Sequence, residues 1–254
     1  MKRDLHIHST FSDGKNTPEE IIKAAIDKDF DEIGFSDHSY IEAEKGYCLD
    51  RGKTEEYISE IFNLKEKYNN KISVLCGIEQ DFYSPFPADK RFDYIIGSVH
   101  YVKINEDLIA VDISPEILTD AAKKYFNGDM LKLAQLYYDT VSRVVLKTNA
   151  DIIGHFDLIS KFNEKYNLFD ESSPRYISAW KKAADVLLQT AKPFEINTGA
   201  ISRGYRTAPY PSLEIKKYIA NRGGKFILSS DSHSVNSLFS DEEYFHFSDN
   251  DTKN

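Results

Sequence analysis

Residues 4–14 read D-L-H-I-H-S-T-F-S-D-G, and this stretch decides the fold. A short apolar run carries two histidines, His6 and His8, and a turn follows at once. Side chains two apart on a strand point the same way, so both imidazoles can reach one cation while Ile7 packs on the other face. Gly14 suits the tight turn, and Asp13 can point back toward the same place.

Six more short apolar runs follow along the chain, with amphipathic stretches between them. Their near-continuous apolar character favours strands buried on both faces, as in a parallel sheet. The predicted strands are 4–7, 32–35, 72–78, 94–99, 151–156, 194–196 and 225–228.

Helix starts lie between these runs. Thr17-Pro18-Glu19-Glu20 is a capping box with proline at the first helical position, and an apolar stripe follows it. Similar starts occur at Thr54, Ser114, Ser173 and Ser212, and a further helix is expected over 130–146. Strands that alternate with helices predict an α/β protein, and α/β barrels commonly reach 254 residues as one domain.

Histidines recur where these strands end. In parallel α/β barrels the carboxyl edge of the strands is where active sites are built. Glu79 follows an especially apolar run, and a carboxylate is costly to bury there unless it is paired or metal-bound. The histidines at this edge are His6, His8, His38, His100, His155 and His233, whereas His246 lies in the C-terminal tail and is given no role.

The residue types at this edge indicate a metal site. Histidine, aspartate and glutamate without cysteine suit zinc, manganese or iron with open coordination positions. The candidates outnumber the ligands of one ion, so two or three divalent ions are predicted. Cys48 and Cys76 form no CxxC pair, and we expect two reduced thiols.

The net charge and the lack of long apolar segments limit the kinds of partner that the protein can bind. The formal net charge is −9, which argues against nucleic acid or an anionic membrane as a partner. A small anionic substrate is still compatible, because bound cations can reverse the sign of the charge inside a pocket.

Without a signal-peptide stretch or an apolar span, we expect a cytoplasmic protein. Residues 1–240 are predicted to form the barrel domain, and residues 241–254 a polar acidic tail. The oligomeric state stays open.

Together the motifs resemble the PHP (polymerase and histidinol phosphatase) superfamily. The motifs that match, in the family's order, are D-L-H-I-H-S-T-F-S-D-G at 4–14, F-S-D-H at 35–38, G-I-E at 77–79, G-S-V-H at 97–100, G-H-F-D at 154–157 and D-S-H at 231–233. The resemblance implies a distorted, TIM-like (β/α)7 barrel. It also implies a trinuclear site, with His6, His8, Glu79 and Asp231 on one ion, Glu79, His100 and His155 on a second, and Asp13, His38 and His233 on a third.

Two further stretches resemble one branch of that superfamily. G-S-V-H-Y-V at 97–102 and E-I-N-T-G-A at 195–200 are most similar to histidinol-phosphate phosphatases. This resemblance implies hydrolysis of L-histidinol phosphate, a step of histidine biosynthesis. Glu79 would bridge two ions, and Asp37, His38 or a metal-bound water would supply a proton to the leaving group.

Substrate contacts are expected after the sixth strand. Arg203 and Arg206 can bind phosphate through paired hydrogen bonds. Glu195 and Asn197 can orient metal ligands or hold the amine of the substrate. Aromatic side chains in loops at the active edge can flank an imidazole ring, and these are Tyr47, Phe82, Tyr101 and Tyr205.

Three alternatives stay open at this point. A PHP phosphoesterase can act on a nucleotide or another small phosphate ester. A metal-dependent amidohydrolase also begins with a similar HxH, but those enzymes usually carry a metal-bridging lysine, and no lysine here follows a matching strand. A non-catalytic module with a decayed site would bind few ions, yet no ligand position of the motif set is lost.

Overall fold

The computed structural model describes residues 1–43 and 46–238. The predicted tail at 241–254, and His246 within it, lie outside these residues. Among the described residues, no helix combines the length and apolar character that a membrane crossing requires.

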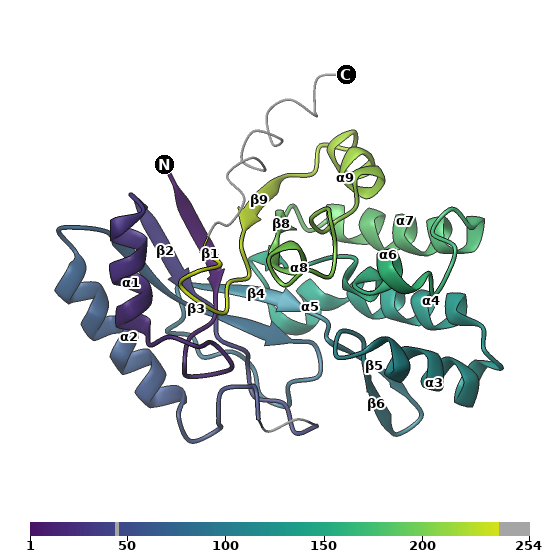
Figure 1. The fold of residues 1–254 in the computed structure, drawn as a ribbon, viewed down its shortest axis with the longest axis horizontal. Helices are drawn as coiled ribbons and strands as arrows, with labels where there is room; N and C mark the ends of the chain where they lie inside the picture. Colours follow the sequence, from purple (N-terminus) through teal and green to yellow (C-terminus); the bar gives the residue numbers. More distant parts are fainter. Residues whose placement is uncertain (44–45, 239–254) are drawn as a thin grey trace.

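A seven-stranded parallel sheet forms the centre of the molecule (Figure 1), in the order β1-β2-β3-β4-β7-β8-β9. Backbone hydrogen bonds beyond β9 bring its end to β1, because Ser232 donates to His6 O at 3.1 Å and accepts from His8 N at 2.8 Å. The sheet is therefore a nearly closed barrel, and the predicted distorted (β/α)7 fold is confirmed. The strands are β1 (Arg3–Ile7), β2 (Glu32–Phe35), β3 (Ser73–Asp81), β4 (Tyr94–Ser98), β7 (Ile152–Ile153), β8 (Phe194–Asn197) and β9 (Phe226–Ser229).

Two strands differ from the predicted lengths. β3 extends beyond the predicted 72–78 to Asp81, because Glu79 and Asp81 find polar partners inside the barrel. β7 covers only Ile152–Ile153 of the predicted 151–156, and the chain leaves the sheet where Gly154 begins the next loop.

Helices surround the sheet (Figure 1). The predicted capping box at Thr17 is present, with Thr17 N donating to Glu20 at 2.9 Å and Glu20 N donating to the Thr17 hydroxyl at 3.4 Å. The helices are α1 (Pro18–Asp27), α2 (Thr54–Tyr68), α3 (Pro115–Phe126), α4 (Met130–Val141), α5 (Val144–Thr148), α6 (Asn163–Tyr166), α7 (Pro174–Leu188), α8 (Gly199–Ser202), α9 (Leu213–Ala220) and the 3-10 helix η1 (Leu158–Ser160).

The single helix predicted over 130–146 is wrong, because α4 ends at Val141 and α5 begins at Val144. At the break, Ser142 Oγ and Arg143 Nε donate to the carbonyl of Asp139, at 2.8 Å and 3.1 Å. Side chains that bond to the backbone in this way compete with the helical hydrogen bonds.

A β-hairpin that the strand pattern did not predict lies between β4 and α3. Strands β5 (Tyr101–Ile104) and β6 (Asp107–Ala110) pair antiparallel, and Asn105 at the turn adopts a φ of 54°. Asparagine tolerates this left-handed conformation better than most residues do. The hairpin follows His100 directly and therefore borders the carboxyl edge of the barrel.

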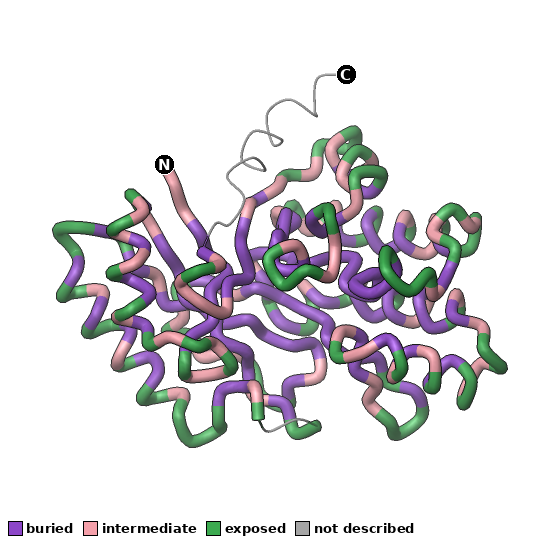
Figure 2. The backbone as a smooth tube through the Cα atoms, in the orientation of Figure 1, coloured by how far each residue is buried: buried purple, intermediate pink, exposed green. Residues whose placement is uncertain are grey.

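Buried residues run along the strands and alternate with exposed residues along the helices (Figure 2). Trp180 is 1% exposed within the larger core cluster, as predicted. Cys48 and Cys76 are both buried and form no disulfide. The packed core leaves the carboxyl edge of the strands as the place where polar side chains gather.

Candidate metal centre

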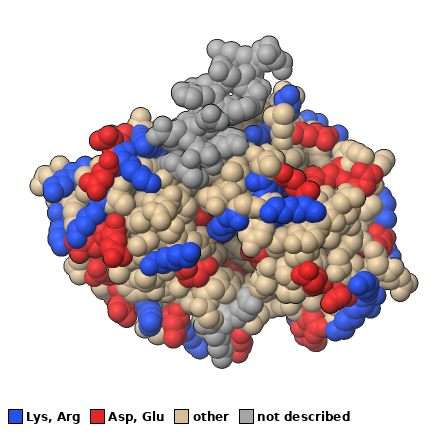
Figure 3. Space-filling model, in the orientation of Figure 1, with Lys and Arg blue, Asp and Glu red and all other residues tan. Residues whose placement is uncertain are grey.

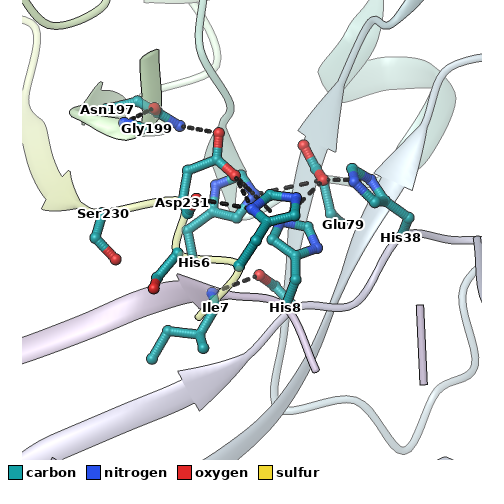
Figure 4. Close-up of polar contacts among 12 residues, drawn as sticks. His6, Ile7, His8, His38, Glu79, Asn197, Gly199, Ser230 and Asp231 are labelled. Carbon is teal, nitrogen blue, oxygen red and sulfur yellow. Dashed lines mark hydrogen bonds and ion pairs between the residues drawn. The ribbon is translucent and has the colours of Figure 1, made fainter. Parts of the chain in front are cut away.

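The His6-Ile7-His8 stretch behaves as its alternation predicts. Ile7 is 1% exposed and packs with the core cluster of α1 and α2, while both imidazoles point to the opposite side. Their ring centroids lie 5.1 Å apart. Figure 4 shows both rings turned toward Glu79 and Asp231. One strand thus delivers two metal-binding groups to one place.

Glu79 is the centre of the cluster. It extends from β3 and is fully buried, and its carboxylate lies within 3.7 Å of five imidazoles. One oxygen faces two of the rings and the other oxygen faces three, which is the arrangement expected of a carboxylate between two cations. The distances are 2.9 Å to His155 Nε2 and 3.4 Å to His100 Nε2 from Oε1, and 2.7 Å to His38 Nδ1, 3.4 Å to His6 Nε2 and 3.7 Å to His8 Nε2 from Oε2.

Asp231 follows β9 and faces the same cluster. Its Oδ1 lies 3.3 Å from His8 Nε2 and 3.8 Å from His6 Nε2. The backbone of Asp231 has a φ of 50°, a conformation that non-glycine residues rarely adopt and that often marks functional sites. The turn after β9 therefore holds this carboxylate toward the imidazoles at some cost in backbone energy.

Asp13 returns to the cluster from the turn after β1. Its Oδ2 lies 3.2 Å from His233 Nε2, and its Oδ1 lies 3.7 Å from His38 Nε2. Three overlapping groups have ligand atoms close enough to share an ion: His8, Asp13, His38 and His233; His6, His8 and Asp231; and His38, Glu79 and His100. His155 joins them through its contact with Glu79.

Several buried ligand atoms have no hydrogen-bond partner among the described residues. Unsatisfied buried nitrogen and oxygen atoms are costly, and coordination of a cation would satisfy them. The imidazole and carboxylate donors also match the preferences of zinc, manganese and iron. These residues therefore fit a multinuclear metal site. The atoms are His6 Nε2 and both ring nitrogens of His8; Glu79 Oε2 also forms no hydrogen bond, although His38 Nδ1 lies 2.7 Å away.

Carboxylates hold the outward nitrogens of two rings. His6 Nδ1 donates to Glu195 at 2.5 Å, and His100 Nδ1 contacts Asp81 at 3.2 Å. Such partners fix the tautomer and direct the other ring nitrogen toward a metal. Asp81 was not predicted, although it lies two residues after Glu79 on the same face of β3, a spacing that indicates its place.

Glu195 and Asn197 lie behind the ligands. Glu195 also accepts from His155 N at 2.8 Å and from Asn197 Nδ2 at 2.9 Å, and both residues are fully buried. Neither residue lines the cavity; both lie behind the histidines and carboxylates of the cluster.

The close packing of imidazoles and carboxylates shifts the pKa values of the cluster residues. Burial alone would raise the pKa of Glu79, but the charges of His6, His100 and His38 hold it well below its usual range. Burial, with the charges of His233 and His38, lowers the pKa of His8 to about 3. Against burial, neighbouring carboxylates raise the pKa of His6, His38 and His100. Metals bind ionised carboxylates and neutral imidazoles, so metal binding would release protons from these three rings.

The proton-donor role predicted for Asp37 does not agree with its position. Asp37 is fully buried and accepts hydrogen bonds from Ser9 N and Oγ, both at 2.8 Å, and from the Ser12 hydroxyl at 2.5 Å. It braces the turn after β1 and does not line the cavity. His38, next in the chain, lines the cavity because neighbouring residues of an extended segment point in opposite directions.

A cavity of about 780 Å³ opens over the cluster. The face in Figure 3 is hollowed near its middle, with basic side chains beside the hollow. The basic residues of the lining are Lys15, Lys161 and Arg203. Arg203 Nη2 lies 3.0 Å from Asp231 Oδ2, so this guanidinium reaches both the cluster and the cavity.

Arg206 is placed differently. Its side chain is 8% exposed, donates to the Ser160 hydroxyl and lies 4.0 Å from Asp157. It also stacks 4.7 Å from the ring of Tyr210 and does not line the cavity. The predicted phosphate contact of Arg206 therefore lacks the placement that it requires, and only Arg203 of the two arginines has it.

Fold and site define a class: an α/β barrel with a multinuclear histidine–carboxylate centre at the carboxyl edge of its strands. The PHP domain family matches residues 4–199, and the chain belongs to this family.

Similar proteins agree with this assignment. The "Probable histidinol-phosphatase" of Schizosaccharomyces pombe is 29% identical over 237 residues, which cover 85% of this chain and 74% of that protein. The structure of the HisK protein of Listeria monocytogenes superposes with a TM-score of 0.81 at 20% identity, over 96% of this chain and all of that one. Histidinol phosphate phosphatase of Lactococcus lactis, solved with zinc, L-histidinol and phosphate, gives a TM-score of 0.68 at 23% identity, over 92% of this chain and 87% of that one.

Proposed function

We propose that this chain is a metal-dependent phosphatase that hydrolyses L-histidinol phosphate to L-histidinol and phosphate. The observation that carries the proposal is the position of Glu79, whose carboxylate lies among five imidazoles under a cavity with basic residues in its lining. The names of the Schizosaccharomyces pombe relative and of the Lactococcus lactis structure, with its bound L-histidinol and phosphate, support the choice of substrate.

The proposed ligand set divides over two or three divalent ions, with zinc favoured by the Lactococcus lactis structure. We assign His6, His8, Glu79, Asp231, His100, His155, Asp13, His38 and His233 as the ligands. When bound, such ions polarise the phosphoryl group and lower the pKa of the attacking water.

The protein's own residues have three tasks in this reaction. Glu195 and Asp81 keep the ligand rings of His6 and His100 in place through their outward nitrogens. Arg203 is proposed to bind phosphoryl oxygens, because its guanidinium borders the cavity beside Asp231. The third task is to supply a proton to the leaving oxygen. His38 lines the cavity and Asp37 does not, but His38 is assigned as a metal ligand and its Nδ1 lies 2.7 Å from Glu79, so neither residue is assigned as the donor.

Phosphate release from L-histidinol phosphate tests the proposal. Protein supplied with zinc, manganese or iron is assayed beside a panel of nucleotides and sugar phosphates. Release from L-histidinol phosphate that exceeds the rest of the panel and stops with a chelator supports the proposal. Turnover of a nucleotide instead would keep the phosphoesterase chemistry and discard this substrate. The domain boundary after residue 240 stays a prediction.

A further inference from the structure

Asp112 reaches the cavity because of the hairpin β5–β6. The pairing of Tyr101 with Ala110 continues into a hydrogen bond from Val111 N to His100 O of 2.9 Å. Val111 is thereby bonded to the backbone of a proposed metal ligand, and Asp112 is the next residue in the chain. In Figure 1 the hairpin lies beside α3, which begins shortly after it. The hairpin therefore brings a carboxylate to the cavity that does not follow a strand of the barrel.

This carboxylate is separate from the metal cluster. Of the carboxylates that line the cavity among the described residues, Asp13 and Asp231 belong to the groups that can hold an ion, and Asp112 does not. Its side chain is 26% exposed, so it is accessible from the cavity yet partly shielded from bulk water. A group in such surroundings interacts more strongly with an opposite charge than a fully exposed one does.

Lys161 holds Asp112 from one side. Lys161 Nζ donates to the backbone carbonyl of Asp112 at 2.6 Å and lies 3.4 Å from Oδ2. The shorter bond fixes the backbone, and the longer one engages a single carboxylate oxygen. No described residue donates a hydrogen bond to Oδ1. Asp112 is thus oriented by Lys161 while half of its carboxylate stays available to a ligand.

The charge of Asp112 complements only one part of the proposed substrate. Phosphoryl oxygens would be repelled by a carboxylate, and the site already provides cationic groups for them. The leaving group of L-histidinol phosphate carries a primary amine, which is protonated at neutral pH. Burial would raise the pKa of Asp112, but the adjacent charge of Lys161 outweighs this and lowers it.

We propose that Asp112 binds the primary ammonium group of the leaving alcohol and thereby selects amino-alcohol phosphates over other phosphate esters. The inference rests on the proposed function and adds a specificity-determining residue to it. Tyr47, Tyr101 and Tyr205 line the same cavity and supply aromatic surface for the rest of the leaving group.

The test compares two substrates that differ only in the amine: L-histidinol phosphate and its deamino analogue, in which hydrogen replaces the amine. For Asp112→Asn, kcat/KM on L-histidinol phosphate should fall at least about tenfold, chiefly through KM, because a hydrogen bond to a charged group is lost. On the deamino analogue the variant should stay within about twofold of the wild type, since uncharged leaving groups make no such bond.

Asp107→Asn is the matched control. Asp107 lies on the same hairpin and pairs with a lysine, Lys124, at 2.8 Å, but it does not line the cavity. This variant should leave both substrates unaffected. Wild-type protein provides a measurement that needs no variant: it should prefer L-histidinol phosphate over the deamino analogue.

The outcomes separate the two proposals. Equal losses on both substrates, no loss on either, or a wild type indifferent to the amine would overturn the role of Asp112 and leave the proposed function standing. Failure of the wild type to hydrolyse L-histidinol phosphate would overturn the proposed function, and the role of Asp112 with it.

Discussion

The two walls of the cavity are built from different parts of the chain and are held in different ways. The strand-end wall consists of residues that follow parallel strands: Asp13, His38, His100, His155, Asp231 and His233. The loop wall consists of residues from the hairpin and the long loops: Tyr47, Tyr101, Asp112, Lys161 and Tyr205. Barrel register places the first set, whereas contacts among loops place the second, such as the 3.1 Å contact between the hydroxyls of Tyr47 and Tyr101.

This difference suggests a division of labour. The strand-end wall holds groups whose chemistry suits metal binding and phosphoryl transfer. The loop wall holds groups whose chemistry suits recognition of the leaving group. If the division is real, changes in the strand-end wall should act on turnover of every substrate, and changes in the loop wall should act on the choice among substrates.

The largest effect is expected from Glu79→Gln. The amide keeps the shape but lacks the charge that two cations would share, so activity should fall on all substrates. Loss of an outer partner of a metal ligand typically costs about 10- to 100-fold, so loss of this central ligand should exceed about 100-fold. Metal content, measured by atomic absorption, should fall by at least one ion per chain.

Glu106→Gln is the control for this variant, because Glu106 is 94% exposed at the tip of the hairpin. It should match the wild type in turnover and metal content. Wild-type turnover by Glu79→Gln would exclude Glu79 from the mechanism and contradict the proposed role of the metal cluster in catalysis.

A smaller effect is expected from Glu195→Gln, which changes a residue behind the strand-end wall. Its carboxylate accepts from His6 Nδ1 at 2.5 Å but does not line the cavity. Weaker orientation of the ring should lower metal affinity by about 10- to 100-fold. Competition with a chromogenic chelator measures this affinity, and excess metal should restore turnover. A change in KM for the substrate with unchanged metal affinity would instead assign Glu195 to substrate binding.

Arg203→Ala and Arg206→Ala form a matched pair of variants, and the effect expected of them on catalysis is the next largest. Removal of Arg203 should raise KM for every phosphate ester roughly tenfold or more, because a charge-assisted hydrogen bond to the phosphoryl group is lost. Inhibition by inorganic phosphate should weaken by a similar factor. Its pairing with Asp231 makes metal content a necessary second readout. Loss of Arg206 should leave KM unchanged and cost about 1 to 3 kcal/mol of unfolding free energy, because it leaves buried partners unsatisfied.

Equal shifts of KM in both variants would contradict this assignment. Such a result would show that the loop after β8 rearranges when substrate binds, so that Arg206 leaves its position beside Asp157 and reaches the cavity. Denaturant unfolding of each variant measures the stability difference independently of the assay.

The strand-end wall could be predicted from the sequence because its signals are local. Apolar runs indicate buried parallel strands, and polar residues directly after them must gather at one edge. His6 and His8 follow from a two-residue period alone. The same reasoning separates Asp37 from His38, since neighbours in an extended segment point in opposite directions, and it indicates Asp81 from its spacing to Glu79.

The loop wall lacked such signals. Asp112 is brought to the cavity by the hairpin register, and Lys161 by the loop after β7, so their meeting depends on contacts between residues 49 positions apart. The two arginines show the same limit. Arg203 and Arg206 lie three residues apart after the short helix α8, and packing against Asp231 or Asp157 decides which of them lines the cavity.

The smallest effect is expected far from both walls, at the start of α1. Thr17→Ala removes one side-chain acceptor of the capping box and should cost about 1 kcal/mol of unfolding free energy. Ser212→Ala is the matched control, because the hydroxyl of Ser212 makes no cap hydrogen bond at α9, and it should change stability little. Both variants should keep wild-type kcat and metal content. Since α1 follows the turn that carries Asp13, a loss of kcat or metal in Thr17→Ala alone would show that the helix start, and not strand register alone, holds the strand-end wall in place.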